Sequence, residues 1–249
     1  MSEIETLRGT IENLYEVFSP YRLRERIDGC YHCHDLEDDL LLRSKELREL
    51  GVNELHRYIW DAMDLWGDDY DFRHFLPRIL EIFALDERLT DEFVDPAIVL
   101  GKLRYGNWAH WPTKEQEAVR RYLFALWESK INREFHWEDY SAPFIEDWLC
   151  GIGKAEDDLE PYLVRWGHAA SSAAVGNLSH FIMSIEKELG EGKLWNPLWY
   201  DRQVQSSQVV RWLLGQTVRE KLIISSTQDL SPASLMWVKR ACATLELLA

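Results

Sequence analysis

The sequence lacks the features that mark several large classes of protein. It has four cysteines among 249 residues, too few and too scattered for a disulfide framework. It has no uninterrupted apolar run near the ~20 residues that a helix needs to cross a bilayer. Acidic side chains interrupt its first twenty residues, so we expect no signal peptide. These absences favour a cytoplasmic protein with no membrane partner.

The common catalytic motifs are also missing. There is no G-x-S-x-G elbow and no glycine loop of the Rossmann or P-loop type. No histidine has a glutamate three residues before it, as the helices of di-iron bundles require. We therefore expect no enzymatic activity, no catalytic residue and no cofactor. The alternative left open is a metal-dependent hydrolase whose ligands are brought together only by the fold.

Positive charge is scarce. Against 43 acidic residues there are 28 basic ones, which gives a formal net charge of −15. Nucleic acids and anionic lipids are bound by clustered Lys and Arg, so this balance argues against either as a partner. It favours encounter with a basic protein, although many proteins are acidic simply for solubility.

Helical periodicity, by contrast, is abundant. Apolar residues recur every three or four positions along residues 4–18 and 55–66, and residues 113–134 predict a long amphipathic helix. Ser231 before Pro232 predicts the start of the last helix. Pro77 is expected to kink or restart its helix, and residues 221–226 are the one segment that resembles a short strand.

These patterns predict an all-α protein. We expect about ten helices, arranged as antiparallel hairpins stacked in a HEAT-like layer or as an irregular bundle. No Pro/Gly/Ser-rich linker divides the chain, so residues 1–249 are expected to form a single domain.

One short stretch, GCYHCHD at residues 29–35, carries the pattern C-x-x-C-H to which haem is attached in c-type cytochromes. Haem attachment does not fit a cytoplasmic chain, and no second C-x-x-C or H-x-x-x-H completes a zinc site. We expect a tight turn with two half-buried thiols and no metal. If a metal did bind, the candidate ligands are Cys30, Cys33 and His34.

Two further groups of residues are candidates for contact with a partner. Acidic residues cluster between or at the starts of expected helices, where stacked hairpins would bring them to one acidic rim: Asp38, Asp39, Asp68, Asp69, Asp157 and Asp158. Trp108 and Trp111 lie in an expected loop between Gly106 and Pro112. Such tryptophans either fold back over a core or anchor a partner.

The run from Trp66 to Arg78, which fits W-G-D-x-x-D-F-R-H-F-L-P-R, resembles a group of bacterial all-helical proteins. This likeness covers about the first 85 residues and implies a helical fold without a particular activity. The chain as a whole resembles immunity proteins that accompany toxins of the type VI secretion system. That resemblance implies a cytoplasmic antitoxin that binds and inhibits a cognate secreted toxin, such as a nuclease, through its acidic surface. The alternative is a helical scaffold that joins other proteins.

Overall fold

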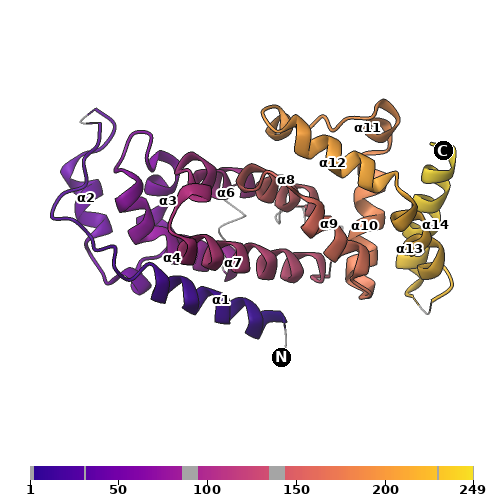
Figure 1. Cartoon of the computed structure of the whole chain (residues 1–249), viewed down its shortest axis with the longest axis horizontal. Helices are drawn as coiled ribbons and strands as arrows, with labels where there is room; N and C mark the ends of the chain where they lie inside the picture. Colours follow the sequence, from indigo (N-terminus) through magenta and orange to yellow (C-terminus); the bar gives the residue numbers. More distant parts are fainter. Residues whose placement is uncertain (1–2, 31, 86–94, 135–143, 229, 249) are drawn as a thin grey trace. The chain divides into compact units, whose positions relative to one another are not determined.

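The computed structural model describes residues 3–30, 32–85, 95–134, 144–228 and 230–248. Over these residues it contains thirteen α-helices, three short 3₁₀ helices and no strand (Figure 1). The all-α prediction is therefore confirmed, with somewhat more helices than expected. No helix among the described residues is long and apolar enough to cross a membrane.

The chain divides into two compact units. Unit 1 comprises residues 1–126 and 141–143, and unit 2 comprises residues 127–140 and 144–249. Helix α7, Thr113–Ile131, contributes to both, since the division falls between Leu126 and Trp127. The prediction of one domain over residues 1–249 stays a prediction.

Unit 1 is built around the contact of α1, Glu3–Val17, with α4, Asp69–Leu85 (Figure 1). Helix α3, Val52–Asp61, packs on α4, on α2, Leu36–Leu42, and on α6, Pro96–Tyr105. The short helices η1 and η2 span Leu47–Glu49 and Trp108–His110. As the spacing predicted, α1 buries one stripe of apolar residues, Leu7, Ile11 and Leu14, which Phe18 continues directly after the helix.

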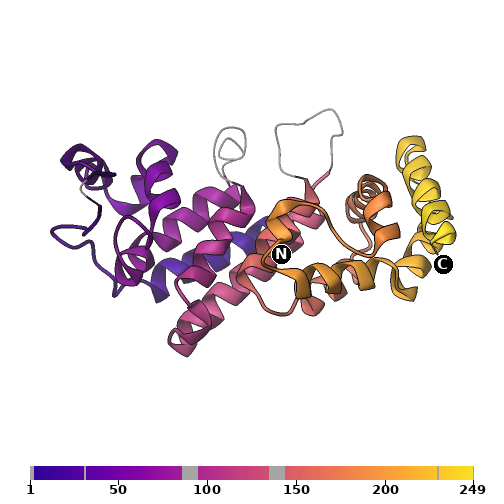
Figure 2. The ribbon, with the colours of Figure 1, turned by 90° about the horizontal axis from the view of Figure 1, so that it is seen from above.

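Unit 2 follows with seven α-helices among its described residues beyond α7 (Figure 2). Helices α10, Ser172–Ser184, and α14, Pro232–Leu247, form its most extensive contact. Around this pair lie α8, Ile145–Ala155, and α13, Gln216–Ser225. Its other elements are α9, Glu160–His168, α11, Glu186–Glu191, η3, Pro197–Trp199, and α12, Gln203–Leu213.

Three local predictions can be compared with these elements. Ser231 does cap α14, because its Oγ accepts a hydrogen bond from the Ser234 amide at 3.1 Å and Pro232 is the first helical residue. Residues 221–226 do not form a strand: residues up to Ser225 belong to α13. Helix α4 does not restart at Pro77 but continues through it as one helix. Tertiary packing overrode the local preference at both sites.

Candidate functional site

The GCYHCHD stretch forms a turn that leads into α2. The Cys33 and His34 amides both donate to the Cys30 carbonyl at 2.9 Å, and the Cys30 amide donates to the Leu65 carbonyl at 2.9 Å. Gly29 fits closely here, because a Cβ atom would lie 3.1 Å from both the Leu65 oxygen and the Trp66 ring and would crowd them. The predicted tight turn is thus confirmed, and a backbone hydrogen bond joins it to the segment that follows α3.

His34 lies beneath this turn. Its side chain is 5% exposed and its ring stacks on Trp66 with a centroid distance of 4.3 Å. Its Nε2 atom is 3.4 Å from an Asp61 oxygen, and its Nδ1 atom is 4.0 Å from an Asp38 oxygen. Neither ring nitrogen makes a hydrogen bond within the described part of the chain. His34 is therefore a largely buried polar group between two carboxylates.

The two thiols of the turn differ in their surroundings. Both are half-exposed. The neighbouring Cys33 thiol, with the backbone amides of His32 and Cys33, lowers the pKa of the Cys30 thiol. The neighbouring Cys30 thiol raises the pKa of the Cys33 thiol, with smaller effects of burial and of the Cys30 and Asp61 charges. Across the described residues, no three His, Cys, Asp or Glu side chains gather as a metal site.

A cavity of about 490 Å³ opens beside this turn. Its lining includes the aromatic residues Trp66 and His34 and the aliphatic residues Ile27 and Leu36. Its charged lining is mostly acidic, with three carboxylates against one guanidinium: Glu25, Asp35, Asp39 and Arg26. Such a cavity suits a cationic group carried by an apolar stem.

Helix α2, next to the cavity, exposes most of its apolar residues. Leu36 is 72% exposed, Leu40 55% and Leu41 42%, whereas only Leu42 of this helix is buried. Leu36 and Leu40 are four residues apart and so lie on one side of the helix. Asp35 caps the helix by accepting hydrogen bonds from the amides of residues 37 and 38. The helix is thereby held with its leucines toward solvent.

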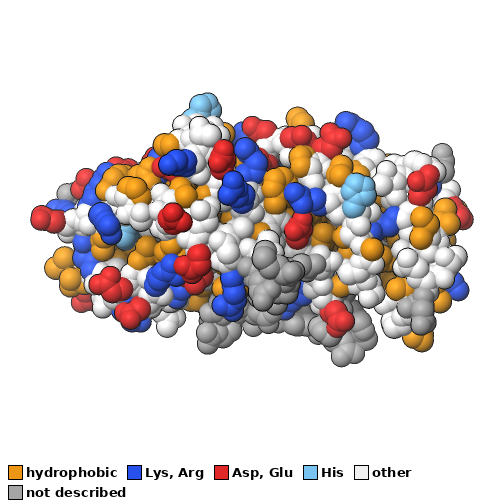
Figure 3. Space-filling model, turned by 60° about the horizontal axis from the view of Figure 1, so that its bottom comes forward, with side chains coloured by type: hydrophobic (Ala, Val, Ile, Leu, Met, Phe, Trp, Pro, Cys, Tyr) orange, Lys and Arg blue, Asp and Glu red, His pale blue; other side chains and the backbone are white. Residues whose placement is uncertain are grey.

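The six aspartates of the predicted acidic rim are largely occupied within their own units. Five of them pair with arginines: Asp38 with Arg57, Asp39 with Arg43, Asp68 with Arg24, Asp69 with Arg73 and Asp157 with Arg202. The sixth, Asp158, accepts hydrogen bonds from the Glu160 amide at the start of α9 and from Gln208. On the face shown in Figure 3, acidic and basic side chains are interspersed. The arrangement differs from an unpaired anionic rim.

Asp68 and Asp71 show how this pairing builds the start of α4. The Arg24 Nη1 atom lies 2.8 Å from an Asp68 oxygen and 3.2 Å from an Asp71 oxygen. Burial, together with the nearby Asp68 charge, raises the pKa of Asp71 to about 6. Gly67 reaches this corner with φ +72°, a backbone conformation that glycine adopts readily. The acidic corner is therefore a helix cap held by one arginine.

Trp108 and Trp111 are both in the core, 2% and 4% exposed. The Trp111 ring packs edge-on against Phe18 at 5.8 Å and its Nε1 donates to the Gly106 carbonyl at 2.8 Å. Of the two roles open from the sequence, this structure has the rings folded back, and neither offers a face to a partner. The Arg73 guanidinium covers the Trp111 ring at 4.4 Å.

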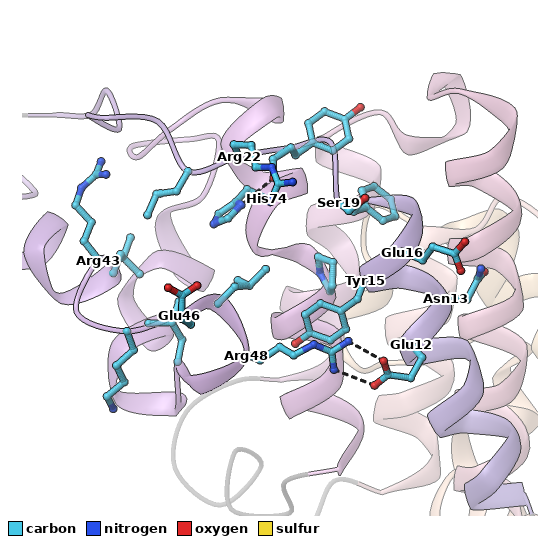
Figure 4. A pocket seen from close by; sticks show the side chains of 18 of the residues that line it. Glu12, Asn13, Tyr15, Glu16, Ser19, Arg22, Arg43, Glu46, Arg48 and His74 are labelled. Atoms are coloured by element: carbon cyan, nitrogen blue, oxygen red, sulfur yellow. Dashed lines mark hydrogen bonds and ion pairs between the residues drawn. The ribbon is translucent and has the colours of Figure 1, made fainter.

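A larger cavity of about 950 Å³ lies elsewhere in unit 1, between α1, the segment around η1 and α4 (Figure 4). Three of its four cations are committed to ion pairs: Arg43 with Asp39, Lys45 with Glu54 and Arg48 with Glu12. Arg48 also covers the Tyr15 ring at 3.7 Å. His74 is tied to the Tyr21 carbonyl at 3.0 Å, and burial lowers its pKa. Of the three ion pairs, Arg48 with Glu12 joins η1 to α1, and Lys45 with Glu54 joins the segment before η1 to α3.

The sequence interpretation missed the feature that now stands out, the exposed leucines of α2. Their letters, LEDDLLL, match the helical pattern of a buried stripe. A signal was nevertheless present: four leucines in a segment of seven residues are more than the single buried face of a short helix can hold.

Comparison with known proteins finds no family model, no curated protein and no solved structure that matches this chain.

Proposed function

We propose that this protein is an immunity protein that binds and inhibits a cognate secreted toxin with a basic surface, and that the α2 surface of unit 1 makes the contact. The α2 surface is the set Leu36, Leu40 and Leu41 with the neighbouring carboxylates Glu25, Asp35 and Glu37. A toxin of the type VI secretion system, such as a nuclease with a basic cleft, would fit this surface.

The exposure of the leucines carries the proposal. Apolar side chains gathered on a surface and bordered by polar ones mark interaction sites. Full burial of one leucine side chain contributes about 1.5 to 3 kcal/mol, so three of them supply a substantial part of a binding free energy. On α2 all three protrude from one short, capped helix. A partner would therefore meet a surface that is already ordered, which limits the entropy lost on binding.

Charge identifies the kind of partner. Unit 1 has 26 acidic and 16 basic residues in its sequence, a formal net charge of −10, against −5 for unit 2. At the α2 surface, Glu25 and Glu37 make no ion pair within the described residues, and Glu25 lines the adjacent cavity. An acidic surface accelerates encounter with a basic protein and disfavours acidic ones. The Glu25 and Asp35 carboxylates beside Trp66 suit a lysine or arginine side chain of the partner.

Inhibition would follow from steric cover. Leucines packed against the rim of a basic cleft would place the α2 carboxylates over it, where they compete with the phosphate groups of a nucleic-acid substrate. Neither Trp108 nor Trp111 would take part in this contact. The aspartates that pair with arginines would stabilise the fold.

The test is co-expression of the full chain with the toxin encoded by the adjacent gene. We expect growth to be rescued and a stable complex to be purified. The double substitution Leu36→Ser with Leu40→Ser should weaken the complex by at least ~100-fold, since both side chains would be central to the contact. Circular dichroism of the variant should match that of the unsubstituted chain.

A matched control lies in unit 2. Ile223 and Ile224 of α13 are 58% and 60% exposed, close to the exposure of the two leucines. Ile223→Ser with Ile224→Ser should leave both rescue and affinity within about threefold of the unsubstituted chain. Equal losses from the two double variants, or rescue that survives loss of the leucines, would refute the α2 surface as the binding site. Absence of any complex and of any rescue would refute the immunity function itself.

A further inference from the structure

Cys30 and Cys33 stand apart from the other two cysteines of the chain. Both are half-exposed, whereas Cys150 is fully buried. Cys242 is half-buried in α14, where burial raises the pKa of its thiol. The two thiols of the turn lie close enough for each to shift the pKa of the other. Solvent access and proximity therefore coincide at one place.

The turn holds the pair in a geometry that a disulfide can adopt. The Cys33 amide donates to the Cys30 carbonyl at 2.9 Å, which closes a turn and brings the two Cα atoms within ~7 Å. A disulfide needs Cα atoms about 4.4 to 6.8 Å apart and Sγ atoms at about 2.05 Å. The backbone of the turn therefore places the two cysteines within the range that a disulfide requires.

The surroundings give the two sulfurs different roles. The neighbouring Cys33 thiol and the backbone amides of His32 and Cys33 lower the pKa of the Cys30 thiol, which favours its thiolate. Arg57 donates to the Cys33 carbonyl and its charge partly offsets that of Asp61 at the Cys33 thiol. The imidazole of His34 and the carboxylate of Asp38 complete the titratable groups of this corner. The Cys30 sulfur is thus suited to attack an external disulfide, and the Cys33 sulfur to attack the mixed disulfide that results.

We propose that Cys30 and Cys33 form a redox-active dithiol that is oxidised to an intramolecular disulfide by low-molecular-weight disulfides. In the first step the Cys30 thiolate attacks one sulfur of the small disulfide, forms a mixed disulfide and releases one thiolate. In the second step Cys33 gives up its proton to that thiolate and its sulfur attacks the Cys30 sulfur. A second small thiolate leaves and takes a proton from solvent, so one disulfide is reduced to two thiols while the protein dithiol is oxidised.

Glutathione disulfide serves as the probe, with the full-length chain. After incubation and acid quenching, mass spectrometry of peptides should find Cys30 linked to Cys33, with Cys150 and Cys242 still free. Cys33→Ser should instead accumulate a stable mixed disulfide on Cys30, because its resolving thiol is gone. Cys30→Ser should react at least ~10-fold more slowly at pH 7, because Cys33 lacks the same thiolate stabilisation.

Three outcomes would overturn the proposal. One is glutathione added to both cysteines of the unsubstituted chain without an internal disulfide. Another is equal reactivity of the two single variants. The third is stoichiometric zinc in the purified protein that blocks alkylation of Cys30 and Cys33 until a chelator removes it. The double variant Leu36→Ser with Leu40→Ser should form the disulfide normally, so this test is independent of the proposed function.

Discussion

The two units of this chain use different interactions in their interiors. Unit 1 encloses charge: Asp71 and Glu115 are 1% and 7% exposed, and each is paired with an arginine, Arg24 and Arg73 respectively. In unit 2, tryptophans fill the centre, with the Trp166 ring stacked on Trp212 at 5.3 Å. Both units bury aromatic rings, but unit 1 also buries two carboxylates, whereas the buried charge among the described residues of unit 2 is the guanidinium of Arg202.

The same contrast extends to the surface and the thiols. The exposed leucines of α2 and the half-exposed Cys30 and Cys33 belong to unit 1. In unit 2 the buried polar side chains bind backbone carbonyls, as Asn177 does with Ile131 and Arg202 with Gly153. These bonds, with the ion pair of Arg202 and Asp157, satisfy the buried groups. Both of our proposals accordingly concern unit 1, and unit 2 provides their controls.

The largest expected effect comes from Trp166→Ala in unit 2. The Trp166 ring is fully buried, and it contacts Trp212, Trp127 and Phe181. Its Nε1 also donates to the Ala174 carbonyl at 3.0 Å. Loss of this ring should lower the free energy of unfolding by about 3 to 5 kcal/mol, measured by urea unfolding. Trp195→Ala, at a ring 42% exposed in the same unit, should cost less than about 1 kcal/mol. Similar losses of unfolding free energy in the two variants would contradict a special role for the buried ring in unit 2.

Charge pairing in unit 1 is tested by Arg73→Met. Arg73 lies 3.1 Å from a Glu115 oxygen, and the Glu115 side chain is 9% exposed. Without the guanidinium, Glu115 stays buried with the Tyr21 hydroxyl as its remaining hydrogen-bond partner among the described residues. The variant should lose about 3 kcal/mol of stability. Adding Glu115→Gln removes the uncompensated charge and should restore at least about 1 kcal/mol. A double-mutant cycle with no coupling would show that the pair does not stabilise unit 1.

These contrasts also show what the sequence reveals. Helices follow from apolar spacing along one segment, which is why α1, α7 and the Ser231 cap of α14 were predicted. Asp39 with Arg43 and Asp69 with Arg73 are four residues apart, a spacing that the sequence does show. Other pairs join residues far apart along the chain, such as Asp68 with Arg24 and Asp157 with Arg202, and no local pattern reports them. The exposure of the α2 leucines likewise depends on which elements pack beside the helix. The sequence alone therefore does not predict most of the candidate site.

Glu146 of unit 2 is a half-buried acid without an ion pair among the described residues, and Glu146→Gln tests how its ionisation affects stability. Burial, with the nearby charges of Glu188 and Asp147, raises the pKa of Glu146 to about 7. The folded state therefore keeps this proton to higher pH than the unfolded state does. Stability should fall as pH rises from about 4.5 to about 7, by roughly 2 to 3 kcal/mol.

The glutamine variant should lose that dependence. Urea unfolding at pH 5 and pH 8 gives the comparison: the unsubstituted chain should lose more stability than the variant between the two values. Parallel pH profiles for the two proteins would mean that Glu146 ionises in the folded state at its ordinary pKa.

The smallest expected effect tests how closely unit 2 is packed. A Cβ atom at Gly153 in α8 would lie 2.8 Å from the Trp199 ring, which is fully buried. Gly153→Ala should therefore cost about 1 to 3 kcal/mol, because neither the ring nor the helix has room to move. Gly176 in α10 has nothing within 4 Å of the same position. Gly176→Ala should stabilise by about 0.5 to 1 kcal/mol, through helix propensity alone. Changes of opposite sign in the thermal stability of the two variants would establish that the Trp199 ring is tightly packed. Stabilisation of both variants would show that this ring shifts freely.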